Sequence, residues 1–431
     1  MRKLFTVAVA AICLISTLSC SSGNREFMVI DVDAPTGTVD LKLSDLLSDI
    51  KIVPLETRES SQLISGGEGI PLISGGGFIR VSGKYIVHYN MSVMYLFDSN
   101  GKYLKLLAVA GGGPNEFRTI SGLLIDDNRD IIYYSDIKNN AMIYRIDLLT
   151  GKHLEPLEVI LEKKNFSFAG MDNSGNIYGF FAGRGGNVIR IGSSTDSENS
   201  EDNGSYSIAH RYNVENNTIE GIEGIVTFSS TGMNRSIAKY GENIWIYDSS
   251  YADTLFSYTK GELWPVMEIK MKDIMADPMV GGHNLNVALA GSQGFLLQHS
   301  YSKVDISTGA SGDISSISVR RPTLKYLFAD KDSGELLTVN SFYIDPIGAT
   351  IDILKALDEK LRGEQLIGIS EFIKVSGDYG YCLIDAYKME SLIEEALAGD
   401  KLSAQEKKSL ETLAAVITED SNPVIITGKI R

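Results

Sequence analysis

The feature that most constrains the fold of this chain is a strand-and-turn unit that recurs along it. In Val81–Arg118, three short runs rich in β-branched and aromatic residues are followed by a glycine-proline loop. A second copy spans residues 130–154, and the turn glycines of the two copies, Gly101 and Gly151, lie fifty residues apart. Weaker copies follow around residues 171–191, 241–262, 294–335 and 377–385.

Short strands in sets of about four, with a period of roughly forty to fifty residues, favour a β-propeller. One such unit cannot bury both faces of its sheet, so neighbouring units must stack and the ring must close. The competing fold is a β-sandwich with long loops, which the repeated strand–turn–glycine units disfavour. We therefore predict an all-β, six-bladed β-propeller of four-stranded antiparallel blades. Ring closure needs a pairing between the chain ends, and we expect Ile50–Leu55 to pair with Val424–Thr427.

The copies spread apart toward the C-terminus, which predicts insertions, including short helices. Ile351–Leu361 and Met389–Ala398 have helical apolar spacing. Ser403 is followed three residues later by Glu406, which is the capping-box pattern that starts a helix. Ser193–Ser205 is a polar tract and is predicted to be a solvated loop.

The N-terminus has the pattern of an export signal. Arg2 and Lys3 precede an apolar run, Leu4–Ile15, that is too short for a comfortable membrane span. Leu18-Ser19-Cys20 follows, and a small residue directly before such a cysteine resembles the lipobox of bacterial lipoproteins. The alternative is an ordinary secretory signal that contains a cysteine.

This pattern divides the chain into a lipoprotein signal peptide (1–19), a polar tether (20–38) and a propeller domain (39–431). The cysteine at the start of the mature chain, Cys20, is the predicted lipidation site. We expect the protein in the bacterial cell envelope, anchored to the outer membrane by the lipid on Cys20. The residues after Cys20 lack an acidic run that resembles a surface-export signal, which favours the periplasmic face.

Charge and cysteine content exclude several classes of partner and cross-link. The net charge of -15 becomes -17 when the two positive charges of the signal peptide are removed, which argues against nucleic acid or an anionic membrane surface as a partner. With Cys20 acylated and Cys13 removed, Cys382 is the remaining thiol, so no intrachain disulfide is expected. The fold must therefore be stabilised by a large core.

A family resemblance rests on several short motifs taken together. Val53-Pro54-Leu55-Glu56-Thr57, Phe97-Asp98 before Gly101-Lys102, the loop Gly112–Phe117 and the terminal Asn422-Pro423 are, with the lipobox, similar to six-bladed β-propeller lipoproteins common in Bacteroidota. The chain departs from that pattern at Asn115, where glycine is frequent, and at Ser421, where an acidic residue is usual. The resemblance implies the fold, with blades distantly similar to NHL-type repeats. It implies no chemistry, because that family is largely of unassigned function.

Two loops have superficial likenesses to known sites. Gly111–Pro114 could be imagined as a phosphate cradle, but no lysine follows it and no helix is predicted there, so a connection between blades is favoured. Asp172–Asn176 resembles part of a calcium loop, yet the twelfth position is Gly183 instead of glutamate. This stretch, like the cluster Asp126, Asp127 and Asp130, is interpreted as a hairpin turn. No cofactor and no metal site are predicted.

Candidate ligand-binding residues are histidines and tyrosines in strand-like runs. A propeller brings distant strands to one channel, and tyrosines at the mouth of that channel could stack on sugars or peptides. The usual role of such residues is packing. The candidates are His88, Tyr89, Tyr134, Tyr247 and His299.

The repeat architecture occurs without a nucleophile, metal or cofactor motif. The first hypothesis is therefore a membrane-anchored propeller that binds a ligand or protein partner, such as a glycan, a peptide or an envelope protein, at one face of the ring. The alternative is a carbohydrate-active lyase or hydrolase whose residues converge on the central channel. A structural role in an envelope assembly is a third hypothesis, and it would predict a broad exposed apolar patch.

Overall fold

A computed structural model describes most of the chain from Phe27 onward. The described residues are 27–58, 78–90, 92–136, 142–158, 165–184, 205–227, 235–240, 243–248, 254–259, 261–272, 281–308, 314–343, 345, 373–399, 402–418 and 421–431. The predicted signal peptide, Cys20, the predicted helix Ile351–Leu361 and most of the tract Ser193–Ser205 lie outside the described residues.

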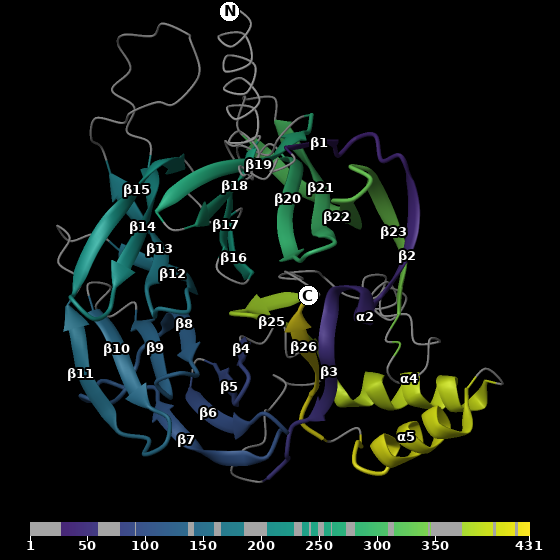
Figure 1. Ribbon diagram of the computed structural model, residues 1–431, viewed down its shortest axis with the longest axis horizontal. Coiled ribbons are helices and arrows are strands. Elements are labelled where there is room, and N and C mark those ends of the chain that lie inside the picture. The colour runs from purple at the N-terminus through teal and green to yellow at the C-terminus, as the bar shows by residue number, and fades with distance from the viewer. Residues whose placement is uncertain are drawn as a thin grey trace, which may run out of the picture.

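Five sheets are each built from four consecutive antiparallel strands and are arranged in a ring (Figure 1). The first two contain β4 (Phe78–Val81), β5 (Tyr85–Tyr89), β6 (Val93–Asp98) and β7 (Tyr103–Val109), then β8 (Ile120–Asp126), β9 (Ile131–Asp136), β10 (Met142–Asp147) and β11 (His153–Glu158). The next two contain β12 (Asn165–Met171), β13 (Ile177–Arg184), β14 (Ser205–Asn213) and β15 (Thr218–Thr227), then β16 (Arg235–Tyr240), β17 (Asn243–Asp248), β18 (Thr254–Thr259) and β19 (Glu262–Lys270). The fifth contains β20 (Gly281–Ala290), β21 (Gly294–Thr308), β22 (Ile314–Asp330) and β23 (Leu336–Tyr343).

A further sheet joins the two ends of the chain, and we call it the composite sheet. It has the strand order β24 (Lys374–Ser376), β25 (Tyr379–Ile384), β26 (Val424–Ile430) and β3 (Leu47–Pro54). Antiparallel pairing places Val424 opposite Pro54 and Ile426 opposite Ile52. The predicted pairing between the chain ends is therefore confirmed.

The N-terminal segment adds a strand to the outer edges of two sheets before it enters the composite sheet. β1 (Met28–Asp31) pairs in parallel with β19, and β2 (Gly37–Lys42) pairs in parallel with β23. A single helical turn, α2 (Leu43–Leu46), then leads into β3. Paired strands thus occupy part of residues 20–38, which the sequence predicts to be a tether. Backbone pairing to β19 and β23 explains the difference, because an edge strand offers unpaired amides and carbonyls to any extended segment.

These sheets confirm the prediction of an all-β propeller of small antiparallel sheets. The finer prediction of six four-stranded blades does not match as stated. Five sheets come from consecutive strands, two of these five gain a fifth strand from β1 and β2, and the remaining sheet is composite. The physical reason is that the N-terminal segment adds strands to edges that would otherwise be open.

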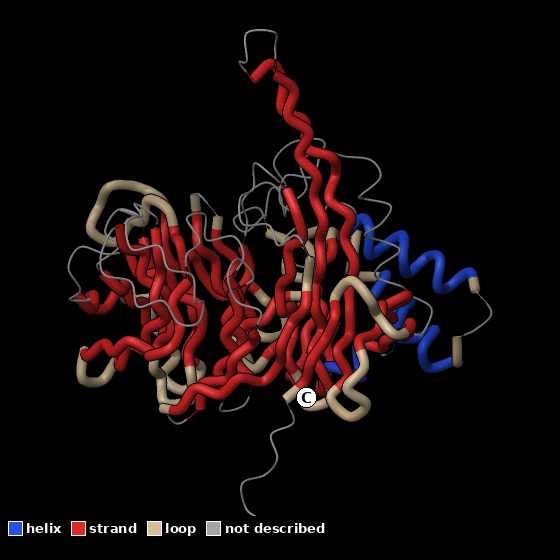
Figure 2. Tube along the Cα trace, turned by 90° about the horizontal axis from the view of Figure 1, so that it is seen from above, coloured by secondary structure: helices blue, strands red, loops and turns tan. Residues whose placement is uncertain are grey.

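The first strand of each sheet lies innermost, where β4, β8 and β12 contact one another in succession. We call the end of the ring at which first strands turn into second strands the turn end, and the other the opposite end. In Figure 2 the C-terminus lies at one side of the ring, and the long hairpin of β21 and β22 projects from the other side. The buried cores fill the spaces between neighbouring sheets. One such core combines residues of β5, β6 and β7 with residues of β8, β9 and β10.

Glycine turns punctuate the strands as predicted. Gly101 and Gly151 have φ values of +82° and +75°, and Gly175 and Gly261 also have positive φ. At Gly101 a Cβ atom would stand 2.3 Å from the carbonyl oxygen of Pro54, so both conformation and space require glycine there. This close approach also fixes the first sheet against the end of β3.

Two helices near the C-terminus confirm the prediction of helical insertions. They are α4 (Ala386–Ala398) and α5 (Ala404–Ala414), which lie outside the ring beside β3 (Figure 1). Ser403 and Glu406 form the predicted capping box at the start of α5. Met389 and Ile393 of α4 are buried in a core shared with the composite sheet and with β20–β23. Within the described part of the chain, neither of these helices nor α2 has the length and apolar character to cross a membrane.

Candidate functional site

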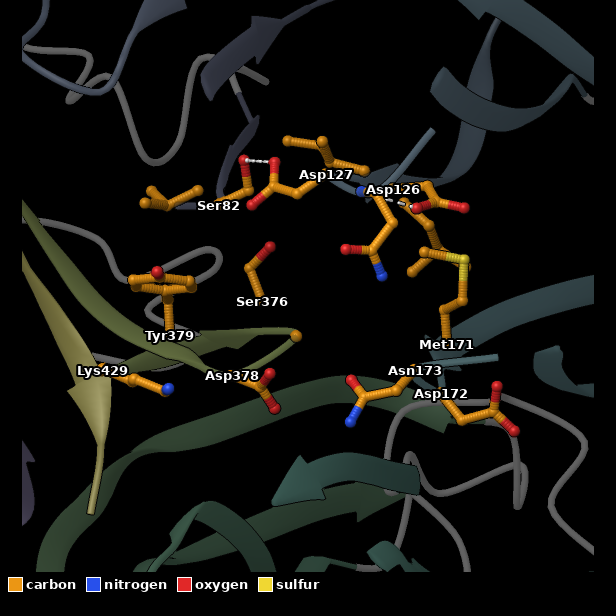
Figure 3. A pocket seen from close by; sticks show the side chains of 15 residues that line it. Ser82, Asp126, Asp127, Met171, Asp172, Asn173, Ser376, Asp378, Tyr379 and Lys429 are labelled. Carbon is orange, nitrogen blue, oxygen red and sulfur yellow. Dashed lines mark hydrogen bonds between the residues drawn. The ribbon is translucent and has the colours of Figure 1, made fainter. Parts of the chain in front are cut away.

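A cavity of about 210 Å³ opens at the turn end of the ring (Figure 3). Its walls come from the composite sheet and from the three sheets that begin with β4, β8 and β12. The lining residues are Val81, Ser82, Leu124, Ile125, Asp126, Asp127, Asn128, Met171, Asp172, Asn173, Ser376, Gly377, Asp378, Tyr379 and Lys429. They belong to the turns that join first and second strands and to the strand residues beside those turns. We call this cavity the turn-end pocket.

The turn after β8 is bonded to the turn after β4. The carboxylate of Asp127 accepts hydrogen bonds from the Ser82 hydroxyl at 2.6 Å and from the Gly83 amide at 2.7 Å. Lys84 donates to the backbone oxygen of Asp127 at 2.7 Å and to the Asp130 carboxylate at 2.9 Å. Hydrogen bonds to a carboxylate are charge-assisted and therefore strong. They hold one wall of the pocket in a fixed shape.

Asp126 stabilises its own turn. Its side chain is buried and accepts from the amides of Asn128 and Arg129 at 3.0 and 3.1 Å. The Arg129 guanidinium adds a bond of 2.8 Å to the same carboxylate and a second bond of 2.9 Å to Glu215. The hydrogen bond that Arg129 donates to Asp126 raises the pKa of Arg129. Asp126 is thus a structural carboxylate.

Asp172 is likewise committed to its turn. It accepts from the amides of Ser174 and Asn176 at 2.9 Å, from the Asn176 side chain at 2.7 Å and from the Tyr178 hydroxyl at 2.9 Å. Burial raises the pKa of Tyr178, and the charge of Asp172 raises it further. The stretch that resembles a calcium loop is therefore a hairpin turn. Among the described residues, no group of three or more histidine, cysteine or acidic side chains could hold a metal ion.

Other side chains project into the middle of the pocket. In Figure 3, Asn173, Ser376, Asp378 and Lys429 extend into the open space, whereas the carboxylate of Asp172 points away from it. Together they offer an amide, a hydroxyl, a carboxylate and an ammonium group. The set can donate and accept hydrogen bonds on several sides of a small polar molecule.

Tyr379 lies beside the wall of the pocket that the Asp127 hydrogen bonds hold in place. A Cβ atom on Gly83 would be 2.7 Å from the Tyr379 hydroxyl oxygen and 3.1 Å from a carboxylate oxygen of Asp127. Glycine at position 83 therefore permits the close approach of the two turns. Burial raises the pKa of Tyr379, and the nearby charges of Asp127 and Asp378 raise it further. The hydroxyl thus stays protonated and can act as a hydrogen-bond donor.

Of the five predicted ligand-binding residues, none lines the turn-end pocket. His88 is 1 % exposed, its ring stacks on Tyr95 at 6.4 Å, and neither ring nitrogen has a hydrogen-bond partner. Burial lowers the pKa of His88 to about 4. His299 is bonded through Nε2 to Nδ1 of His283 at 2.8 Å, and burial lowers its pKa to about 4.

The three tyrosines among these candidates lie in the cores between sheets. Tyr89 stacks on Phe78, and Tyr134 stacks on Tyr144 at 5.2 Å. Tyr89 and Tyr134 share the core between the first two sheets, whereas Tyr247 belongs to the core between the sheets of β16–β19 and β20–β23. The structure thus brings two of the five together, through packing.

The glycine-proline loop connects two sheets, between β7 and β8. The Glu116 carboxylate accepts from the Gly113 amide at 2.7 Å, and a Cβ atom on Gly111 would collide with that carboxylate. Phe117 is fully buried and anchors the end of the loop. These contacts account for Gly111 and Gly113 as parts of a connecting loop.

The sequence predicted these acidic stretches to be hairpin turns, and no ligand-binding role was predicted for them. The signal that would have found the pocket is positional. Asp127, Asn173 and Asp378 each follow the first strand of their sheet, so a propeller brings all three to one end of the channel. Aligning the repeats by their first strands, instead of seeking histidines, would have grouped them.

Comparison with known proteins identifies the family. The model of a domain of unknown function, DUF4934, matches residues 27–429. The chain belongs to this family. None of the curated proteins compared with the chain matches it.

Solved structures resemble the fold of this DUF4934 protein at low sequence identity. A protein of Bacteroides fragilis described as exported is 13 % identical with a TM-score of 0.50, over 94 % of this chain and 100 % of that one. An auxiliary nutrient-binding protein of Bacteroides thetaiotaomicron is 13 % identical with a TM-score of 0.32, over 61 % and 57 %. A polysaccharide lyase, an ulvan lyase, is 13 % identical with a TM-score of 0.37, over 61 % and 64 %. Because its TM-score reaches 0.50, the first likeness alone supports an argument, and at 13 % identity that argument concerns the fold alone.

Proposed function

We propose that this DUF4934 protein binds a small polar ligand in the turn-end pocket and does not transform it. The observation that carries the proposal is the convergence of four sheets on one cavity whose walls are fixed by the Asp127, Asp126 and Asp172 bonds. Preformed walls reduce the ordering that a ligand would have to impose, which favours binding.

The chemistry of the pocket supports a hydroxyl-rich ligand, such as a glycan, over a polyanion. Asn173, Ser376 and the Tyr379 hydroxyl offer neutral hydrogen-bonding groups, and Asp378 accepts from hydroxyl groups. Among the described lining residues, Lys429 is the single cation beside four aspartates. Asp126 is paired with Arg129 and the Asp172 carboxylate points away, so Asp127, Asp378 and Lys429 set the local charge, which is net negative and disfavours a sulfated or uronate-rich ligand. A peptide with a free amino group is the second ligand class that this charge balance supports.

Calorimetry on the full chain, purified in detergent, tests the proposal. Neutral oligosaccharides, uronate oligosaccharides and short peptides are titrated separately, with product formation followed by chromatography. We expect binding of a neutral glycan, weakened at least tenfold by Ser376→Ala and by Lys429→Ala. Matched controls on the helical insertion, Ser391→Ala and Lys407→Ala, change exposed residues outside the pocket and should leave affinity unchanged. Equal affinities for all four variants would contradict the proposal.

An enzyme is the second candidate, and one observation favours it. Carboxylates from different sheets, Asp127 and Asp378, line the same cavity, and glycoside hydrolysis uses a pair of carboxylates. Against it, both oxygens of Asp127 already accept hydrogen bonds, from Ser82 and Gly83. A lyase or hydrolase would release product from the titrated glycan, and Asp378→Asn would abolish that release. Turnover with this behaviour would replace the binding proposal.

The cellular location is also a proposal. A lipid on Cys20 would hold the fold near a membrane, because Met28 of β1 follows only eight residues later. Eight residues span at most about 28 Å, so the propeller would stay close to the bilayer surface. Cys20→Ser should move the protein from the membrane fraction to the soluble fraction. Exposure to an added protease on intact cells would distinguish the cell surface from the periplasmic face.

We further propose that the composite sheet acts as the closing blade, which would give the ring six members with NHL-like blades. β24 contacts β16 and β20, and its neighbour β25 contributes Tyr381, which bonds to Ile79 of β4. The composite sheet thus meets sheets on both sides. Deleting residues 424–431 should abolish cooperative unfolding if this sheet closes the ring, whereas an independent appendage would leave the main transition intact.

A further inference from the structure

Two histidine side chains on neighbouring strands of the fifth sheet are bonded to each other, away from the turn that joins those strands. Nδ1 of His283 on β20 lies 2.8 Å from Nε2 of His299 on β21. The ring planes are inclined by only 10°, and the ring centroids are 5.0 Å apart, which is roughly the nitrogen separation plus the radii of the two rings. The rings therefore meet edge to edge, and the hydrogen bond runs close to the plane of both, which is the geometry of a strong bond.

The two histidines differ in their access to water. His299 is 8 % exposed, and Leu285, which pairs with it on β20, is fully buried in the core between the sheets of β16–β19 and β20–β23. His283, near the start of β20, is partly exposed. His299 is therefore the fixed member of the pair, and His283 is the member that can turn into solvent.

Three other titratable groups from the described residues lie around the pair. Tyr301 of β21 pairs with His283, and the two ring centroids are 4.6 Å apart. Lys325 of β22 pairs with His299, and Asp33 lies in the segment that follows β1. The pKa of His299 is lowered to about 4, by burial first and then by the charges of His283 and Lys325, while the charge of Asp33 raises it. These surroundings oppose a second positive charge on the pair.

Proton counting gives the pair two states. An imidazolium ion carries a proton on both ring nitrogens, so it can donate hydrogen bonds but cannot accept them. The bond between His283 and His299 needs one donor and one acceptor, so the bonded pair can hold one positive charge but not two. We propose that the pair is a pH-sensitive latch between β20 and β21, closed while the two rings share a proton and opened when acid supplies a second charge. On opening, His283 turns into solvent and His299 stays at the edge of the core. The latch shares no residue with the turn-end pocket.

The test is a pH titration of the full chain in detergent from about pH 7.5 to about pH 4, with NMR of ¹⁵N-labelled histidine rings. We expect a scalar coupling between Nδ1 of His283 and Nε2 of His299 at neutral pH, and two titration steps separated by at least about one pH unit. The coupling should vanish with the second step, while the backbone amide signals of the first sheet keep their positions.

Two variants identify the source of the second step. His283→Gln can still bond to His299 but never gains a charge, so it should raise the titration midpoint of His299 by about one pH unit. The matched control is His153→Gln, which changes a histidine of β11 whose Nε2 lies 3.3 Å from the backbone oxygen of Leu107. This control should leave both steps of the pair unchanged.

Several outcomes would overturn the latch. Independent titration of His283 and His299, each in a single step, would show that the rings share no proton. An unchanged midpoint of His299 in His283→Gln would show that burial alone sets it. Loss of the coupling only together with the amide signals of the first sheet would mean that acid unfolds the whole chain instead of opening the latch. If His283→Gln does not fold, His283→Asn must give the same upward shift of the His299 midpoint.

Discussion

Replacing His88 should make the protein less sensitive to acid. His88 of β5 pairs in register with Ile79 and Tyr95, and its ring is buried without a hydrogen bond to either nitrogen. Its strand neighbour on the same face, Ile86, packs in the core that contains Tyr381 and Ile425 of the composite sheet. The imidazole therefore lies where the first sheet meets the sheet that joins the chain ends. Protonation would place an unpaired charge in that contact.

The magnitude follows from the difference between folded and unfolded pKa values. Burial lowers the pKa of His88 from 6.5 to about 4 in the folded protein. Because the folded pKa is the lower one, the unfolded chain binds the proton more readily, and stability falls as the pH falls below 6.5. The free energy of unfolding falls by about 3 kcal/mol in total as the pH drops to about 4. About 2 kcal/mol of this fall occurs between pH 7.5 and pH 5. Above pH 6.5 both states are neutral and His88 adds no pH dependence.

Urea unfolding at pH 7.5 and pH 5 measures this effect in the wild type, His88→Phe and His88→Leu. We expect the wild type to lose about 2 kcal/mol more than either variant over this interval. Phenylalanine and leucine fill the buried space at position 88 differently, so the two variants should have different free energies of unfolding at pH 7.5. The change in that free energy between pH 7.5 and pH 5 should be the same for both. Other titrating groups, including His299, are present in all three proteins and cancel in the comparison. Parallel pH profiles for the wild type and both variants would refute the reasoning.

Three further changes test contacts of the fold by urea unfolding at neutral pH. Gly101→Ala should lower the free energy of unfolding by at least about 3 kcal/mol, since the added Cβ would clash with the Pro54 carbonyl oxygen. Gly261→Ala, with a similar φ but open space around it, should lower the free energy of unfolding by about 1 kcal/mol. Asn422→Ala should lower the free energy of unfolding by about 1 to 3 kcal/mol, because its buried side chain donates a hydrogen bond to the backbone oxygen of Glu56 at 2.9 Å. A smaller loss would show that a water molecule donates to the Glu56 oxygen in place of the Asn422 amide. Ser403→Ala should cost about 1 kcal/mol through the lost cap of α5, and an unchanged midpoint would argue against that helix contributing to global stability.

The parts of the fold that could be predicted are those governed by local chemistry. A turn glycine such as Gly101 predicts a residue with positive φ. The Ser403–Glu406 pair predicts the start of a helix from four consecutive residues. The pairing of β3 with β26 was predictable because closure of a ring leaves few partners for two apolar terminal runs. The parallel additions of β1 and β2 were not predictable. Nothing in their sequence distinguishes a strand on the edge of β19 from an extended tether.

The candidate site was harder to predict, since its chemistry depends on long-range placement. His88 and Tyr134 looked functional because they are polar or aromatic in strands, yet the packing of sheet on sheet buries both. Asp127 looked like an ordinary turn residue and Asp378 was not singled out, and the two line one cavity only because the ring places their turns side by side. A residue's position along its repeat therefore carried more information about the site than its chemical type.

The order of the strands has a consequence for folding. β3 finds its partner only when β26 is available, and β26 occupies the last residues of the chain. β1 and β2 likewise need β19 and β23, which lie more than two hundred residues away in the sequence. Contacts this distant are formed late, because loop closure must precede them. Each strand of the N-terminal segment can therefore pair only after its own partner, β19, β23 or β26, is in place, and its pairing with β26 closes the ring.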